Sequence, residues 1–357
     1  MDIVTTSNFH ATLLQRTSST ILDQHSSIPI EKLIVVFLSN HQLRQCSWPL
    51  LKLLLYASER LNDSNQAEIF SIVVEKDGVT IFMDPSGIEL FKIAELEPLL
   101  TIAPDMWCAV QIHLGPLVAE FPGINSSFLS KLLAEDDISI LNLSTFDTDI
   151  IFVRETNLEV AISCLKSKLS RGFHGLKEAK EAERDLVFDF ACNSHLVGQR
   201  IHSPSKIVAH DQYLVVFPES FVLVRLRKES IRSCAFGLTQ MVLMSPCDPQ
   251  SPSISFWCYC ETAEEISLVV DERSLLSFPQ EAVVVAPDRW RAIKLCGRLY
   301  GFDETGVVAA MSGLDSQTQV LNFSSFGSNV TMVLSEALDV SLEALRRSLS
   351  ISRVQFL

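Results

Sequence analysis

A short acidic turn carries the residues best suited to hold a small charged molecule. Residues 301–306 (GFDETG) place acids between glycines and run directly into the small apolar residues 307–311 (VVAAM). This order predicts a helix whose first N–H groups are unpaired and whose dipole favours a carboxylate, while Asp303 or Glu304 is left to meet a cation. Such a turn would hold both charged ends of a free amino acid. The alternative interpretation is that Asp303, Glu304 and Thr305 only cap the helix.

Residue patterns for catalysis are absent from the sequence. There is no GxSxG nucleophile turn, no HExxH zinc motif, no GxxxxGK[ST] phosphate loop and no GxGxxG dinucleotide motif. The eight histidines and nine cysteines show no metal-ligand spacing, and the cysteines form no CxxC pair. An odd number of scattered cysteines in apolar surroundings is typical of reduced thiols in the cytoplasm. We therefore expect a cytoplasmic protein that is not an enzyme and uses neither a metal nor another cofactor.

Composition and charge predict a large folded protein that avoids anionic surfaces. The chain has 357 residues, a formal charge of −14 and 47% hydrophobic residues, which is enough for several domains with sizeable cores. No basic patch offsets the excess of acids, so neither nucleic acid nor a membrane is an expected partner. No apolar run approaches the roughly 18 residues that indicate a membrane span. The Ser- and Thr-rich residues 1–29 predict a disordered tail.

The sequence contains an internal duplication of about half its length. The matched pairs, in chain order, are 81–84 (IFMD) with 268–271 (LVVD), Trp107 with Trp290, and 141–146 (LNLSTF) with 321–326 (LNFSSF). Their offsets drift from 268 − 81 = 187 through 290 − 107 = 183 to 321 − 141 = 180. A drifting offset with unchanged order indicates a duplication followed by changes in loop length.

Within each half, strand and helix patterns alternate in a fixed order. In the first half they predict strands at 32–39, 70–75, 79–83, 107–112, 138–143 and 149–154, and helices at 48–58, 88–93, 127–133 and 158–169. The Asp77-Gly78 pair is a strong hairpin signal. The order strand-helix-strand-strand-helix-strand is the ferredoxin-like βαββαβ plan, in which helices cover one face of an antiparallel sheet. The sequence therefore predicts an α+β protein of four such modules, arranged as two duplicated halves.

These modules and their connections divide the chain into six segments. We expect a disordered tail at 1–29, a first module at 30–97, a second at 98–170, a linker at 171–208, a third module at 209–284 and a fourth at 285–357. The linker is placed by the charge-dense stretch LKEAKEAERD and by the Ser-Pro loop that follows it.

Several motifs in this frame resemble known proteins. The last module, from TGVVAAMSGL to SEALDVSLEAL, is similar to ACT domains of the aspartokinase regulatory type. Over residues 30–350 the chain resembles the CASTOR family of cytosolic arginine sensors, which act on the TOR pathway. The motifs that carry this resemblance are PLLKLL (49–54), STFDTD (144–149), VRE (153–155), SISF (253–256) and GFDE with Gly306 (301–306).

The resemblance implies four ACT modules with a free amino acid, arginine being the first candidate, bound between the second and the fourth. Matched by position, the implied ligand residues are Ser139 and Ile140 of the second module and Gly301, Glu304, Thr305, Gly306, Val307, Ser325, Phe326 and Asn329 of the fourth. The residue pattern and the family thus agree on the same turn, which favours the ligand interpretation over capping. The family carries a carboxylate where this chain has Asn329, so a guanidinium would meet one acidic partner, Glu304.

The resemblance also implies a protein partner, a GATOR-type regulatory complex. The implied partner-binding residues are Phe146, Asp147, Thr148 and Asp149. The family sequence there is Tyr-Gln-Thr-Asp, so Thr148 and Asp149 are retained and the first two residues differ. Because this segment is a turn between two strands, we expect it to be solvent-exposed. A homodimer is a further possible assembly.

The resulting hypothesis is a non-enzymatic amino-acid sensor in TOR-pathway nutrient signalling, whose ligand shifts an equilibrium between partner-binding states. Two alternatives remain open. One is an orphan ACT regulatory subunit that gives an amino-acid biosynthetic enzyme its feedback control. The other is a scaffold that has lost ligand binding, for which Asn329 is the main argument.

Overall fold

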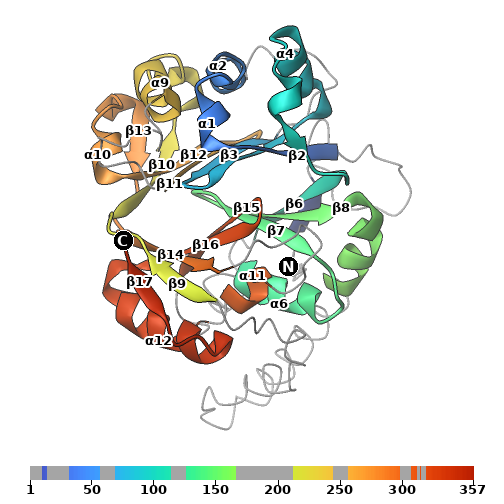
Figure 1. Cartoon of the computed structure of the whole chain (residues 1–357), viewed down its shortest axis with the longest axis vertical. Helices are drawn as coiled ribbons and strands as arrows, with labels where there is room; N and C mark the ends of the chain where they lie inside the picture. The colour runs from blue at the N-terminus through green and yellow to red at the C-terminus, as the bar shows by residue number, and fades with distance from the viewer. Residues whose placement is uncertain are drawn as a thin grey trace, which may run out of the picture.

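The structure, a computed structural model, consists of two β-sheets that lie face to face, with helices on the outer face of each (Figure 1). It describes residues 10–13, 32–56, 69–113, 126–165, 212–243, 256–297, 307–311, 314 and 319–357. The predicted linker at 171–208 and the acidic turn at 301–306 lie outside the described residues.

The first sheet joins strands from both halves of the chain. Its order is β5–β2–β4–β3–β11–β12–β10–β13, with antiparallel neighbours throughout. The strands are β2 (Lys32–Leu38), β3 (Phe70–Glu75), β4 (Gly78–Met83), β5 (Thr101–Ile102), β10 (Phe221–Leu226), β11 (Phe256–Glu261), β12 (Ile266–Asp271) and β13 (Val283–Val285). The halves meet at β3 and β11, where Ile72 lies opposite Tyr259. The β3–β4 hairpin confirms the turn expected at Asp77-Gly78.

The second sheet also contains strands of both halves. Its order is β1–β6–β8–β7–β15–β16–β14–β9–β17, in which β9 and β17 are parallel and the other neighbours antiparallel. The strands are β1 (His10–Leu13), β6 (Trp107–His113), β7 (Ile140–Ser144), β8 (Asp149–Arg154), β9 (Tyr213–Val216), β14 (Trp290–Cys296), β15 (Val320–Ser325), β16 (Ser328–Leu334) and β17 (Val354–Phe356). The halves meet at β7 and β15, where Leu143 lies opposite Phe323.

Each half begins with a strand that joins the second sheet. β1 pairs with β6, which starts at Trp107, and β9 pairs with β14, which starts at Trp290. Residues 10–13 therefore form a strand inside the tail that was expected to be disordered, because the edge of β6 offers unpaired backbone groups. β9 lies within the segment 209–284 expected for the third module, but it pairs in the sheet of the fourth.

Equivalent contacts in the two halves support the duplication. β2 pairs with β6 at Trp107, and β10 pairs with β14 at Trp290. The last residues of the matched IFMD and LVVD segments, Asp84 and Asp271, each accept backbone N–H bonds at the start of the helix that follows. The two halves therefore share local structure as well as sequence.

The space between the sheets is filled by a continuous apolar core. On β2, Leu33 faces the other sheet while Ile34 faces the helices. Phe82 of β4 stacks on Phe152 of β8 with ring centroids 4.5 Å apart, so the core joins the two sheets directly. Because both faces of each sheet are covered, strands such as β2 (KLIVVFL) are continuous apolar runs rather than alternating ones.

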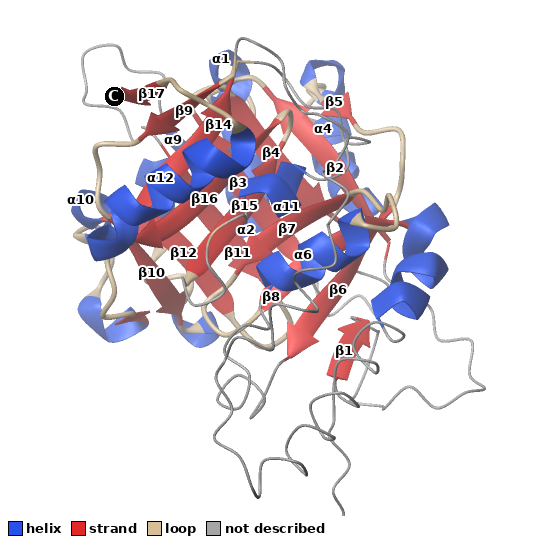
Figure 2. Ribbon diagram, turned by 90° about the horizontal axis from the view of Figure 1, so that it is seen from below, coloured by secondary structure: helices blue, strands red, loops and turns tan. Residues whose placement is uncertain are grey.

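The helices form the two outer layers. Those over the first sheet are α1 (Asn40–Leu43), α2 (Ser47–Leu55), α4 (Ile88–Ile93), α9 (Ala235–Leu243) and α10 (Glu272–Leu275). Those over the second sheet are α6 (Ser126–Ala134), residues 158–165, α11 (Val307–Met311) and α12 (Leu338–Leu349). In Figure 2, α6, α11 and α12 lie over its strands. Single 3-10 turns are η1 (Pro85–Gly87), η2 (Glu97–Leu99), η3 (Glu155–Asn157), η5 (Lys228–Ser230), η6 (Gln280–Ala282) and η7 (Ser335–Ala337). The expected mixture of helix and strand is confirmed, and the predicted modules share two sheets.

Candidate functional site

The second sheet has a seam, defined by β7 and β15, where the two halves of the chain lie side by side. The N–H of Asn142 donates to Ser324 Oγ (2.9 Å), and the N–H of Asn322 donates to Ser144 Oγ (3.0 Å). These residues are equivalent in pairs, since 322 − 142 and 324 − 144 both equal the offset of 180. The two hydrogen bonds are therefore reciprocal, and the seam is a pseudo-two-fold contact.

On the fourth-module side of the seam, a network of neutral groups faces the helices. Ser324 Oγ donates to Asn329 Oδ1 (3.2 Å), and Asn329 Nδ2 donates to Thr331 Oγ1 (3.3 Å). Thr331 Oγ1 donates to Asn322 Oδ1 (2.8 Å). Asn329 is 1% exposed, and both ends of its amide are engaged in this neutral network. A ligand that contacts the Asn329 amide must therefore bind alongside its hydrogen bonds to Ser324 and Thr331 or replace them.

Helix α11 lies across the seam. Val307 packs in the apolar core of the fourth module, whereas Val308 packs with apolar residues of the second module. Ile140, at the start of β7, belongs to the same cluster as Val308, and its neighbour Ser139 is buried. The predicted residues that precede α11, and that lie outside the described part of the chain, are Gly301, Glu304, Thr305 and Gly306. The structure thus brings Ser139, Ile140 and Val307 to one seam.

Two other predicted ligand residues face the opposite side of the sheet. Ser325 Oγ donates to Glu75 Oε1, and the N–H of Phe326 donates to Thr80 Oγ1 (2.8 Å). The Phe326 ring stacks on Phe37 with centroids 4.6 Å apart. Ser325 points away from the face of Ser324 because successive strand residues alternate, whereas Phe326 lies just beyond the end of β15. Both residues therefore contact the first sheet rather than the face that carries the neutral network.

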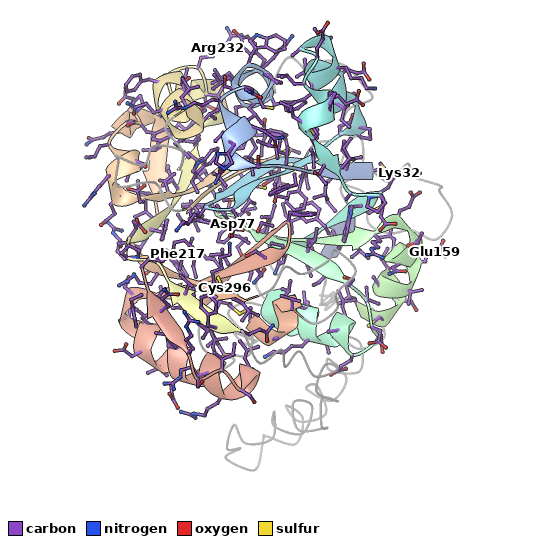
Figure 3. The ribbon with its side chains drawn as sticks, in the orientation of Figure 1. Lys32, Asp77, Glu159, Phe217, Arg232 and Cys296 are labelled. Atoms are coloured by element: carbon purple, nitrogen blue, oxygen red, sulfur yellow. The ribbon has the colours of Figure 1, made fainter. Side chains whose placement is uncertain are left out.

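A charge cluster centred on the buried side chains of Lys294 and Glu75 fixes this contact between the sheets. Lys294 Nζ on β14 lies 2.5 Å from Glu75 Oε2 and 2.6 Å from Asp77 Oδ2; Figure 3 labels Asp77 near the boundary between the sheets. Burial opposes the charged form of Lys294, but the two carboxylates outweigh burial and raise its pKa above the ordinary lysine value. Sequence reasoning missed this cluster, although a lysine inside the apolar run WRAIKLC was a usable signal.

The turn expected to bind a partner contacts the third module. The N–H of Phe146 donates to Ser267 Oγ (2.8 Å), and the N–H of Asp147 donates to Glu265 Oε1 (3.2 Å). Arg225 forms ion pairs with Asp147 and Glu265, and its guanidinium lies 4.6 Å from the Phe146 ring centroid. Asp147 is exposed, as expected, but the other residues of the turn are half-buried and the first sheet supplies hydrogen-bond and charge partners that hold it.

The remaining residues of that turn point back to the seam. Thr148 O accepts hydrogen bonds from the N–H and Oγ1 of Thr145, which closes the turn. Asp149 Oδ1 accepts a hydrogen bond from Ser144 Oγ (2.6 Å). Asp149 therefore lies at the base of the turn, on the same strand pair that forms the second-module side of the seam.

Other kinds of site are not found within the described part of the chain. It holds no group of three or more His, Cys, Asp or Glu side chains placed to bind a metal ion. Its helices include none with the length and apolar character of a membrane span. Burial raises the pKa of the Cys46 thiol to about 11, so this cysteine is a packed thiol rather than a reactive thiolate.

Sequence comparison identifies the domains on either side of the seam. A family model described as an ACT domain matches residues 102–167 and 285–347. Both matched segments are similar to ACT domains. The first match includes β6 to β8, and the second spans β14 to most of α12, so the two segments that meet at the seam both match the ACT model; we call them the ACT segments.

Curated relatives match most of the chain. The rat protein named cytosolic arginine sensor for mTORC1 subunit 1 is 27% identical over 278 residues, which cover 74% of this chain and 78% of the rat protein. The human protein of that name is 26% identical over 316 residues, 84% of this chain and 90% of the human protein. The chain is therefore similar to these sensors over most of its length, as its motifs indicate. Aspartate kinase from Synechocystis matches at 12% identity over 92% of this chain and 56% of its own, with a TM-score of 0.31.

Proposed function

We propose that this protein is a non-enzymatic, cytosolic sensor that binds a free amino acid between its second and fourth modules. The observation that carries the proposal is the position of α11, which packs Val307 into one ACT segment and Val308 into the other. A ligand bound at the start of α11 would therefore touch both segments. The names of the homologous sensors make arginine the first candidate.

Each proposed ligand residue has a distinct role. The backbone N–H groups that would receive the ligand carboxylate are those of Gly301, Thr305, Gly306 and Val307. Glu304 would pair with a cationic side chain, and Ser139 with Ile140 would close the site from the second module. Ser325 and Phe326 act indirectly, because they fix the β15–β16 turn to the first sheet.

Asn329 sets the expected strength of arginine binding. Where the family has a carboxylate, this chain has a neutral amide that is already engaged on both sides. Losing one charge-assisted partner of a buried cation costs about 1.5–3 kcal/mol, or about 10- to 150-fold in affinity. Arginine is therefore expected to bind through Glu304 and more weakly than a site with two carboxylates would allow.

Signalling is proposed to pass through the turn formed by Phe146, Asp147, Thr148 and Asp149. Asp149 is hydrogen-bonded to Ser144, and Ser144 accepts the N–H of Asn322 from the other ACT segment. A ligand that changes the seam would therefore change the support of the turn. The proposed partner is a regulatory protein complex of the GATOR type in TOR-pathway nutrient signalling. The ligand would shift the seam between two conformations, one of which binds the partner. It can do so only to the extent that it binds the two conformations with different affinity.

The four-module plan and the assembly state belong to the same proposal. The family-model match covers the second and fourth modules, and the strands of the first and third modules occupy equivalent places in the first sheet. We therefore infer two further ACT-like modules at 30–97 and 209–284, with β9 assigned to the fourth. A homodimer is an additional proposal, which light scattering at known concentration measures directly.

A thermal-shift panel of the twenty amino acids tests the proposal. A ligand at 100 times its Kd adds about 2.7 kcal/mol of stability, which raises the melting temperature measurably. Arginine is expected to stabilise the wild type, and Glu304→Ala is expected to weaken arginine binding at this site, and so reduce the shift, without lowering the melting temperature of the free protein. If no amino acid at millimolar concentration stabilises the protein, the sensor function is wrong. Co-purification with an amino-acid biosynthetic enzyme would instead favour an orphan regulatory subunit.

A further inference from the structure

The two sides of the seam differ in charge. By the offset of 180, Asp149 on β8 stands where the fourth module has Asn329, and Ile151 stands where it has Thr331. Ile151 packs in the apolar cluster that includes residues of α6. The side chains of Asp149 and Ile151 on β8 therefore face the helices, as those of Asn329 and Thr331 do on β16. The second-module side thus carries a carboxylate at the position where the neutral network has an amide.

The same side also carries an unpaired amide. Asn322 Oδ1 accepts a hydrogen bond from Thr331 (2.8 Å), but the residue opposite Asn142 is Ile151, which has no donor. Asn142 is 0% exposed, and neither its Oδ1 nor its Nδ2 has a hydrogen-bond partner among the described residues. Buried side-chain amides are nearly always hydrogen-bonded in folded proteins, so a missing partner at Asn142 indicates a ligand.

We infer that Asn142, Ser144 and Asp149 form a second ligand site, related to the proposed one by the pseudo-two-fold axis, for a small molecule that bears a guanidinium group. This site is additional to the proposed sensor site and uses none of its residues. Ser144 Oγ holds one oxygen of the Asp149 carboxylate (2.6 Å). The carboxylate can still pair with a cation, because a carboxylate accepts about four hydrogen bonds in total.

A guanidinium fits this pair of groups by geometry as well as charge. Asp149 and Asn142 occupy diagonal positions on one face of an antiparallel strand pair, where side chains are about 7–8 Å apart. The planar fork of a guanidinium offers five N–H donors, enough to reach Asp149 with one edge and Asn142 Oδ1 with another. A ligand there would also lie at the base of the Phe146–Asp149 turn.

Calorimetric titration with L-arginine and with L-citrulline, its neutral counterpart, tests this site. Asp149→Asn keeps an oxygen for Ser144 but removes the charge, so it is expected to weaken arginine binding at the second site about tenfold or more. Citrulline binding is expected to change less than threefold. Glu304→Ala is expected to leave the second site unaffected, because it removes the cation partner of the proposed site alone.

A matched pair of asparagine variants separates ligand binding from packing. Asn142→Leu removes an amide without breaking a hydrogen bond to a described residue, so the free protein is expected to melt at the same or a higher temperature while arginine binding at the second site is lost. Asn322→Leu breaks the bond to Thr331 and is expected to lower the melting temperature. If Asn142 has only a structural role, Asn142→Leu will leave arginine binding unchanged.

The outcomes distinguish this site from the proposed one. Arginine binding that is lost in Asp149→Asn and Asn142→Leu, but retained in Glu304→Ala, supports the second site even if the sensor site fails. Arginine binding that requires Glu304 and stays within twofold in both other variants overturns the second site and leaves the sensor site standing. Absence of any arginine binding to the wild type overturns both.

Discussion

Replacing Glu75 by glutamine is expected to weaken the contact between the two sheets strongly. Lys294 Nζ lies 2.5 Å from Glu75 Oε2, and the two side chains are 8% and 3% exposed. Glutamine keeps the shape and an acceptor for Ser325, but it removes the charge that compensates the buried ammonium. Removing one partner of a buried ion pair costs about 3–5 kcal/mol. Asp77, 2.6 Å from Nζ, remains as a partner, so we expect the lower end, about 3 kcal/mol.

Urea unfolding at pH 7 measures this loss against a matched surface pair. Lys32 and Glu155 approach to 2.6 Å, but their side chains are 52% and 42% exposed, so Glu155→Gln should change the free energy of unfolding by less than about 1 kcal/mol. The double variant Glu75→Gln with Lys294→Met should recover much of the loss, because it leaves no uncompensated charge. A loss for Glu75→Gln no larger than that of Glu155→Gln would refute the reasoning.

The same pair gives stability a defined dependence on pH. The carboxylates raise the pKa of Lys294 above its ordinary value of 10.5 despite burial. The contribution of Lys294 to the free energy of unfolding is therefore complete below pH 10.5. It is lost as the pH rises through the higher pKa of Lys294 in the folded state. The stability difference between the wild type and Glu75→Gln should stay constant from pH 7 to 9 and shrink in strong alkali.

Four further outcomes follow from the site. Asn329→Asp should tighten arginine binding at the proposed site about tenfold; an unchanged calorimetric Kd would show that residue 329 does not meet the cation. Glu304→Ala should remove calorimetric arginine binding at the proposed site with an unchanged melting temperature of the free protein, and a lowered melting temperature would mark it as a structural cap. Asp147→Ala should abolish partner capture while the arginine Kd stays within twofold, whereas retained capture would remove the turn from the partner interface. Cys46 should resist iodoacetamide at pH 8, because its thiol pKa is about 11; rapid labelling of the folded protein would contradict its burial.

Local pattern was sufficient to predict most individual elements. The strand expected at 149–154 is β8 with the same bounds, and the helix expected at 127–133 is α6 (Ser126–Ala134). Trp107 and Trp290 lie at equivalent places in the second sheet, as the duplication predicts. These features depend on residues that are close in sequence or repeated, so their signal is present in the chain itself.

Pairing between distant strands could not be predicted in the same way. β1 and β9 join the second sheet through partners that are far away in the sequence, and nothing in their own short runs specifies those partners. Register decides which face of β15 carries Ser325, because successive strand residues point to opposite faces. Ser325 therefore points away from the face that carries Ser324. Glu75 ends a strand before a turn and resembles a surface acid until the second sheet covers it.

The candidate site was predicted unevenly for the same reason. Val307 and Ile140 reach the seam because they belong to regular elements that the pattern identifies. The unpaired amide of Asn142 becomes apparent only once Ile151 is known to lie opposite it. Sequence alone gives the residue types of such a site, whereas the pairing of strands gives its partners.

Hydrogen–deuterium exchange of the wild type with and without saturating arginine tests the central claim most directly. If an amino acid is bound between the two ACT segments, protection should increase together in β7 (Ile140–Ser144), in β15 (Val320–Ser325) and in α11 (Val307–Met311). Protection confined to one side of the seam, or located in the first sheet, would contradict the claim.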